Sequence, residues 1–274
     1  SRRPVVPHGA KDPIGAARPL RCCPHAHCVR CPPRGPSVPS ERPGGTDLPI
    51  AVRHVDAGLL VLDKPPGLLS VPGRGPDKQD CLSARVQKQY PDALVVHRLD
   101  MATSGLMLMA RGRQALSILN RAFARREVHK RYQALVWGQV NGDGDSWQTI
   151  DLPIAVDWPD RPRRVISADG KPSLTRWRML GHPQTLAHAA SSAALTESAQ
   201  PTPRAGLASR LELEPVTGRS HQLRVHLRAI GHTIVGDRLY GDDDAPRLML
   251  HASWIGLSHP LSGEPLEFSS LPDF

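Results

Sequence analysis

A polar run at residues 97–105, HRLDMATSG, joins two short apolar segments at 94–96 and 105–110. Apolar segments of this length predict buried strands. A short connection between two such strands has little conformational freedom, and the core beneath it holds it in place. The sequence therefore predicts that Asp100 lies in a tight, rigid turn between two pieces of a core.

Asp100 and the neighbouring Arg98 make this turn a candidate site. A guanidinium within a few ångström keeps a carboxylate ionised, so that the carboxylate can act as a nucleophile or a base. An ordinary structural ion pair fits the same local composition, because ion pairs also perturb pKa values. The turn by itself leaves both interpretations open.

The rest of the chain predicts more strands than helices. Strands are predicted at 59–62, 94–96, 105–110, 132–137, 173–180, 207–213 and 248–250. Helices are predicted at 83–90, 114–124 and 219–230. The strands do not alternate regularly with helices, so the pattern favours an α+β domain over a doubly wound one.

The predicted helix 219–230 has two different faces. Its apolar stripe is made of Leu223, Leu227 and Ile230. A neighbouring face carries His221, Arg224 and Arg228 at spacings of three and four, and Gly231 ends the helix. We expect solvent around Arg228.

Composition limits the class of protein. A chain of 274 residues with 39% hydrophobic content can bury one sizeable core. No apolar run approaches the length of a membrane span and no signal peptide is recognisable, which predicts a cytoplasmic protein. The net charge of +9 indicates a polyanionic partner.

Residues 1–49 differ in kind from the rest. They hold eight Lys or Arg against three acidic residues and carry no helical or strand period, which predicts a disordered basic extension before one domain at 50–274. A possible zinc cluster there is Cys22, Cys23, His25, His27, Cys28 and Cys31. Because only Cys28 and Cys31 have the spacing of a metal knuckle, we expect no metal.

Two smaller features complete the organisation. A low-complexity stretch at 182–206 predicts a long surface hairpin inserted between two strands, and no role is assigned to it. Cys81 opens a helical stretch and is interpreted as a small apolar filler.

Three motifs in sequence order resemble the RluA family of RNA pseudouridine synthases. They are HRLDMATSG at 97–105, KRYQALVWG at 130–138 and PVTGRSHQLRVH at 215–226. LDKPPGLLSVPGR at 62–74 and DLPIAVDWP at 151–159 further resemble the subgroup that acts on both 23S ribosomal RNA and tRNA. The resemblance covers residues 50–274 and implies a mainly antiparallel mixed sheet with flanking helices and a central catalytic cleft.

The resemblance also implies roles for individual residues. Asp100 is the expected nucleophile or base, Arg224 its partner in the cleft, and Tyr132 the residue that stacks beneath the target base. Substrate-binding positions are expected at His97, Arg98, Leu99, Thr103, Lys64, Arg74, Arg219, His221 and Gln222. Arg98 is expected to fill the space that an extruded uridine leaves, and Lys64 and Arg74 to contact phosphates.

Pseudouridine formation breaks the N-glycosidic bond, turns the base and joins C5 to C1′ without a redox change. One carboxylate is sufficient, whether it attacks covalently or removes a ribose proton to give a glycal, and both routes stay open. No metal or cofactor is expected. Because extruding a base costs least in a loop, the expected substrates are a tRNA anticodon stem-loop and a 23S rRNA hairpin loop, with no membrane and no obligate protein partner.

Two alternatives stand beside this interpretation. A non-catalytic RNA-binding or ribosome-assembly factor would keep the fold, and a narrower synthase would act on only one of the two RNA classes. Asp100, Tyr132 and Arg224 all match the motifs at positions that an inactive relative is free to lose, which favours catalysis.

Overall fold

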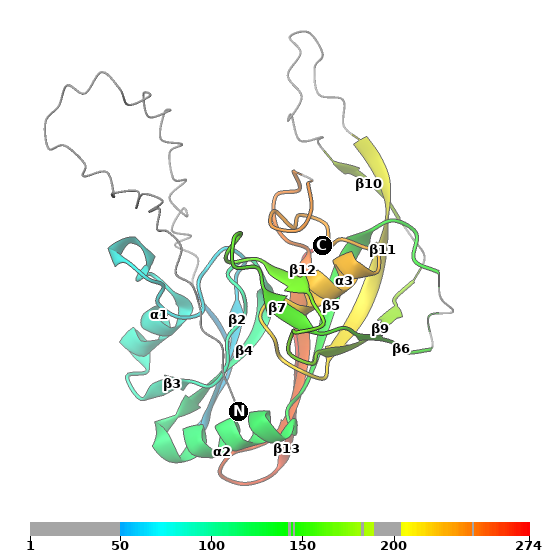
Figure 1. Ribbon diagram of the computed structural model, residues 1–274. Coiled ribbons are helices and arrows are strands. Elements are labelled where there is room, and N and C mark those ends of the chain that lie inside the picture. The colour runs from blue at the N-terminus through cyan, green and yellow to red at the C-terminus, as the bar shows by residue number, and fades with distance from the viewer. Residues whose placement is uncertain (1–49, 142–143, 145, 182–183, 189–203, 243) are drawn as a thin grey trace, which may run out of the picture. The chain divides into compact units, whose positions relative to one another are not determined.

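The computed structural model describes residues 50–141, 144, 146–181, 184–188, 204–242 and 244–274 (Figure 1). The extension predicted at 1–49, with its cysteines, lies outside these residues. Among the described residues, no helix is long and apolar enough to cross a membrane.

Strands dominate the described part of the chain. They are β1 (Ala51–Val55), β2 (Leu59–Lys64), β3 (Ala93–Val95), β4 (Ser104–Arg111), β5 (His129–Trp137), β6 (Gln148–Asp151), β7 (Ile154–Val156), β8 (Arg164–Ile166), β9 (Leu174–Met179), β10 (Gln184–His188), β11 (Arg204–Pro215), β12 (Leu250–Ser258) and β13 (Pro265–Ser269). The helices are α1 (Leu82–Gln89), α2 (Gly112–Arg125) and α3 (Gln222–Ala229), with a short 3-10 turn at Pro76–Lys78.

Most strands join one large sheet in the order β1-β2-β4-β12-β5-β11-β9-β6. β3 pairs with β4, β10 with β11 and β13 with β12, while β7 and β8 form a separate hairpin. Every pair recorded between described strands is antiparallel except that of β4 with β12. The predicted α+β class and the mainly antiparallel mixed sheet are confirmed.

The core forms on both faces of β4, whose residues Ser104 to Ala110 are all buried. On one face Leu108 packs in a cluster with Leu119 of α2, and on the other Met109 packs with Val86 of α1. Figure 1 shows these two helices beside β3 and β4, and α3 among the strands farther along the sheet. A strand buried on both faces explains why 105–110 is continuously apolar.

The third helix begins later than predicted. His221 has a left-handed backbone (φ 57°) and α3 starts at Gln222, so the prediction of a helix from 219 is wrong. The side chain of Gln222 explains the difference, because its Oε1 accepts hydrogen bonds from Thr217 Oγ1 (2.8 Å) and Arg219 N (3.0 Å) and holds that segment as a loop. Gly231 follows the helix at φ 86°, as predicted.

Other differences concern strands. The predicted strand at 248–250 is wrong, since β12 begins at Leu250 and runs to Ser258. The strands β1, β6, β7, β8 and β13 are absent from the predictions because they are short or mostly exposed, which leaves little apolar periodicity. At the base of the predicted insertion, Gln184–His188 pairs antiparallel with β11, and 189–203 lie outside the described residues.

Cys81 is buried and has a second role besides filling space. It is the N-cap of α1, where its Sγ accepts a hydrogen bond from the amide of Ala84 at 3.4 Å. The side chain therefore replaces one of the hydrogen bonds that a helix start lacks.

We predict that Gly105→Ala disrupts the junction of β4 and β12. Gly105 has φ 106°, and a Cβ there lies 2.4 Å from the carbonyl oxygen of Ala252. The expected loss of unfolding free energy is about 3 kcal/mol or more, measured by urea denaturation. Gly263→Ala is the control, because φ is 79° but nothing lies within 4 Å; a cost near 1 kcal/mol is expected there. Equal losses would contradict the steric explanation.

Candidate active site

The turn that carries Asp100 is held by backbone and side-chain hydrogen bonds. The amide of Thr103 donates to the carbonyl of Asp100 at 3.1 Å. Ser70 donates from Oγ to the carbonyl of Leu99 at 2.7 Å and accepts from the Leu99 amide at 3.1 Å. These bonds fix the path of the chain on both sides of the carboxylate, as a rigid turn requires.

Lys64, at the end of β2, is a buried cation beneath this turn. Its Nζ donates to the carbonyls of Pro65 (2.8 Å), Leu68 (2.8 Å) and Met101 (3.0 Å). Burial lowers the pKa of Lys64 to about 7, and the charge of Asp100 acts in the opposite direction. All three ammonium donors are used, so the predicted phosphate contact of Lys64 is wrong: the side chain braces the turn from within.

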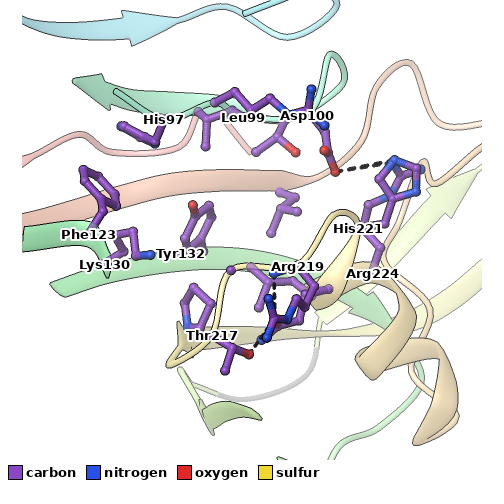
Figure 2. A pocket seen from close by; sticks show the side chains of 17 residues that line it. His97, Leu99, Asp100, Phe123, Lys130, Tyr132, Thr217, Arg219, His221 and Arg224 are labelled. Carbon is purple, nitrogen blue, oxygen red and sulfur yellow. Dashed lines mark hydrogen bonds and ion pairs between the residues drawn. The ribbon is translucent and has the colours of Figure 1, made fainter. Parts of the chain in front are cut away.

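Asp100 lies on the wall of a cavity of about 330 Å³, together with most of the predicted site residues. The lining includes His97, Arg98, Leu99, Thr103, Tyr132, Arg219, His221, Gln222 and Arg224. Figure 2 shows Asp100 and His221 facing each other at one end, and His97, Phe123 and Lys130 gathered at the other. Asp100 is the one carboxylate among the described residues that line this cavity.

Arg224 binds a carboxylate that the sequence analysis did not single out. Its Nε and Nη2 donate to the two carboxylate oxygens of Asp237 at 2.8 and 2.5 Å, and both side chains are almost completely buried. The expected pairing with Asp100 is present at a longer distance, 3.8 Å from Nη1 to Oδ2. Burial lowers the pKa of Arg224, but the hydrogen bonds with Asp237 outweigh it and raise the pKa. Arg224 therefore presents a permanent positive charge to Asp100.

His221, the residue directly before α3, faces Asp100 with 3.9 Å between its Nε2 and the carboxylate Oδ2. The hydroxyl of Tyr240 accepts the amide hydrogen of Arg164 at 2.8 Å and lies 2.8 Å from His221 Nδ1. This hydrogen bond with Tyr240 fixes the orientation of the His221 ring, so that its Nε2 lies on the side of Asp100. Burial lowers the pKa of His221 against the charge of Asp100, which favours the neutral ring beside the carboxylate.

Tyr132 and His97 line the cavity with aromatic rings. Burial and the charge of Asp100 raise the pKa of Tyr132, which keeps its hydroxyl protonated. His97 stacks on Phe123 with 4.9 Å between ring centroids, and its Nε2 accepts the amide hydrogen of Leu108 at 2.9 Å. Burial and then the charge of Lys130 lower the pKa of His97 to about 3. Both rings are therefore neutral, flat surfaces rather than charged contacts.

Two further predictions, for Arg98 and Gln222, need correction, and the phosphate contact predicted for Arg74 stays a prediction. Arg98 is exposed and makes no ion pair with Asp100 in the described structure, so it does not keep that carboxylate ionised. Gln222 lines the cavity, but its amide also donates to the carbonyl of Leu174 and the hydroxyl of Thr175, so its hydrogen-bonding capacity serves the fold. Arg74 is exposed and lies outside the cavity lining.

Other predicted positions are consistent with contact to a substrate. Arg219 is exposed at the cavity, with its Nε donating to the carbonyl of Pro172 at 3.3 Å. Thr103 is buried at the cavity wall, and Leu99 contributes an apolar surface there. No cluster of potential metal ligands was found among the described residues.

Asp237 and Tyr240 are the functional candidates that sequence reasoning missed. They lie in the run VGDRLYG at 235–241, where both residues stand between Gly236 and Gly241. Two glycines around polar and aromatic residues indicate a structured loop, as the polar run at 97–105 does. Their partners, however, lie in other segments, with Arg224 in α3, His221 just before it and Arg164 in β8, and no local pattern indicates these contacts.

Comparisons with known proteins agree with one another. The family model for RNA pseudouridylate synthase matches residues 58–229. The protein named dual-specificity RNA pseudouridine synthase RluA from Escherichia coli O6:H1 is 40% identical over 231 residues, covering 82% of this chain and 94% of that protein. The protein of the same name from Vibrio vulnificus is 45% identical over 212 residues, covering 76% and 77%. The solved human RNA Pseudouridylate Synthase Domain Containing 1 is similar with a TM-score of 0.61 and 28% identity, covering 82% and 84%.

We predict that Asp237→Asn destabilises the fold because it removes the close charged partner of the buried Arg224 and leaves only Asp100 at 3.8 Å. The expected loss of unfolding free energy is about 3 kcal/mol in urea denaturation. Glu127→Gln is the control, because the Arg125–Glu127 pair is mostly exposed at 3.9 Å; its loss is expected to stay below about 1 kcal/mol. Similar losses in the two variants would show that the buried pair is not a main support.

A second prediction concerns pH. His97 has a pKa of about 3 in the folded state against an ordinary value of 6.5, so the unfolded state binds the proton first as pH falls. The stability that neutral His97 contributes is therefore present above pH 6.5 and decreases toward pH 3. Replacing His97→Gln keeps an acceptor without a titration, and the unfolding free energy of the variant should depend less on pH across this range. An unchanged pH slope would contradict the assignment.

Proposed function

The chain belongs to the RNA pseudouridylate synthase family, which confirms the resemblance of its three motifs, and we propose that Asp100 carries the isomerisation of uridine to pseudouridine. The observation that carries this assignment is that Asp100 is the one carboxylate among the described residues lining the cavity. Hydrolysis of a glycosidic bond ordinarily uses two carboxylates and an activated water. A single carboxylate beside a permanent cation suits a reaction that rejoins the base to the same sugar.

Each residue at the cavity has a separate role in the proposed isomerisation. Asp100 attacks covalently or removes a ribose proton, with Arg224 Nη1 at 3.8 Å and His221 Nε2 at 3.9 Å from its carboxylate. The C1′–N1 bond breaks, the uracil turns, and C5 bonds to C1′ as Asp100 is released from its covalent bond or returns the ribose proton. The C5 proton then leaves to solvent and N1 takes one up, so that the product is an isomer of the substrate. Tyr132 offers the neutral face on which the uracil lies.

The substrate is RNA, and the target uridine enters the cavity by extrusion from its stack. We propose two substrates, a tRNA anticodon stem-loop and a 23S rRNA hairpin loop, because the relatives at 40% and 45% identity are named dual-specificity enzymes. Loops suit this reaction because their bases leave the stack at low cost. No protein partner is needed for the chemistry, and a cytoplasmic location stays a prediction from the sequence.

Arg98, Arg219 and Arg74 are proposed as RNA contacts. Arg98 and Arg219 are exposed at the cavity, where a guanidinium reaches phosphates or stacks in the space of the extruded base. Arg74 lies away from the cavity lining and is proposed to contact a more distant phosphate.

We expect Asp100→Ala and Asp100→Asn to abolish isomerisation and to leave RNA affinity within about tenfold, because the cavity and its cations remain. The measurement is release of tritium from C5-labelled uridine in unmodified tRNA and in a 23S rRNA hairpin. Asp169→Asn, an exposed carboxylate that lies outside the cavity lining, is the control and should retain full release.

Each outcome has a definite meaning. Release by the wild type from both RNAs supports dual specificity, and release from one RNA supports the narrower synthase. Binding without release from either RNA would contradict the proposed substrates. Loss of RNA binding in Asp100→Asn would show that the carboxylate holds the structure rather than performs the reaction.

A further inference from the structure

A second and larger cavity, of about 770 Å³, adjoins the turn that carries Asp100. Arg98, Leu99, Asp100, His221 and Arg224 line both cavities. The turn is therefore a shared wall, and whatever fills the second cavity lies next to the reacting carboxylate. The proposed function uses only the smaller cavity, where Tyr132 supports the target uracil.

The walls of the second cavity are mainly apolar. Its lining includes Leu69, Val71, Met101, Leu239 and Leu248. Met101 is 45% exposed, although it is a large apolar side chain directly after Asp100. An apolar cavity of several hundred Å³ is large enough for a planar base, and apolar side chains bind the faces of unstacked bases.

The charges of the second cavity favour an anion beside that base. Arg98 and Arg238 are exposed at the cavity, and neither makes an ion pair with a residue that the structure describes. Arg247 also lines it but is engaged by Asp273 and by the hydroxyl of Ser104. Asp100 is the one carboxylate among the described lining residues, so the exposed guanidinium groups are available to phosphates.

We propose that the second cavity binds the base of a nucleotide adjacent to the target uridine in the same RNA loop, with Arg98 and Arg238 on the adjoining phosphates. The inference rests on the proposed function, because an RNA strand that delivers uridine to one side of the turn must continue along the turn. A base held in the second cavity keeps the loop open and fixes which uridine reaches Asp100. The cavity thus contributes to the choice of target, beyond the chemistry of the first cavity.

The test is a double-mutant cycle between protein and RNA. An abasic ribose replaces the neighbours of the target uridine one at a time, and each RNA is assayed with wild type and with Leu239→Ala. We expect one position at which the abasic RNA loses about tenfold in single-turnover rate or affinity with the wild type. Leu239→Ala should lose a similar factor with intact RNA, and the combination should lose little more.

Arg238→Ala provides a variant on the exposed surface, where folding is not at risk. It should weaken RNA binding and reduce the salt dependence of binding, since one phosphate contact is removed. Arg228→Ala is the matched control, because Arg228 is exposed and lies outside both cavity linings. Equal effects of the two arginine variants, or losses that multiply in the cycle, would overturn the proposal.

Measuring both rate and affinity separates this proposal from the proposed function. Isomerisation with no coupling between the abasic position and Leu239 overturns only the base-binding role of the second cavity. Coupling in affinity without isomerisation supports that role and contradicts the assigned chemistry.

Discussion

The site depends on how the polar turn after residue 96 is held above the sheet. Lys64 fills the space beneath the turn and gives its three N–H groups to the carbonyls of Pro65, Leu68 and Met101. Ser70 adds two hydrogen bonds to Leu99. A buried ammonium without these acceptors would be strongly unfavourable, so the turn and the segment 65–70 are stable only together. Because the two segments stabilise each other, Asp100 is held in one position, where it lines both cavities.

The site also depends on the buried ion pair of Arg224 and Asp237, because this pair sets how closely Arg224 approaches Asp100. Asp237 takes the strong bidentate contact, at 2.8 and 2.5 Å, and leaves Asp100 at 3.8 Å from the remaining guanidinium nitrogen. Asp100 is thus near a cation without being fully engaged by it, and its side chain is 27% exposed. The role proposed for Asp100 needs this condition, because a closely paired carboxylate would have to break its contacts before attack. His221, whose ring is hydrogen-bonded to Tyr240, brings its Nε2 to 3.9 Å from the same carboxylate.

Sequence patterns predicted the strands that build the core but not the interactions between distant segments. The apolar run at 105–110 predicted β4 correctly, because burial on both faces leaves a continuous apolar signal. From the sequence, Lys64 is expected to contact a phosphate or to be solvated. Its burial follows from the approach of the Asp100 turn 37 residues away, which local composition does not record. Arg98 can pair with Asp100 only if the two side chains lie within a few ångström of each other, and closeness in sequence does not ensure this.

The sequence by itself determined the class of fold, the identity of the candidate carboxylate, and the family, because each follows from residue types and spacing within short segments. The tertiary structure alone decided which charges meet: Asp237 rather than Asp100 as the close partner of Arg224, Lys64 as an internal brace, and Tyr240 as the group that orients His221. It also decided that the turn lines two cavities. The physical reason is that hydrogen bonds and ion pairs depend on distances of a few ångström between segments far apart in sequence, and only packing of the sheet and α3 sets those distances.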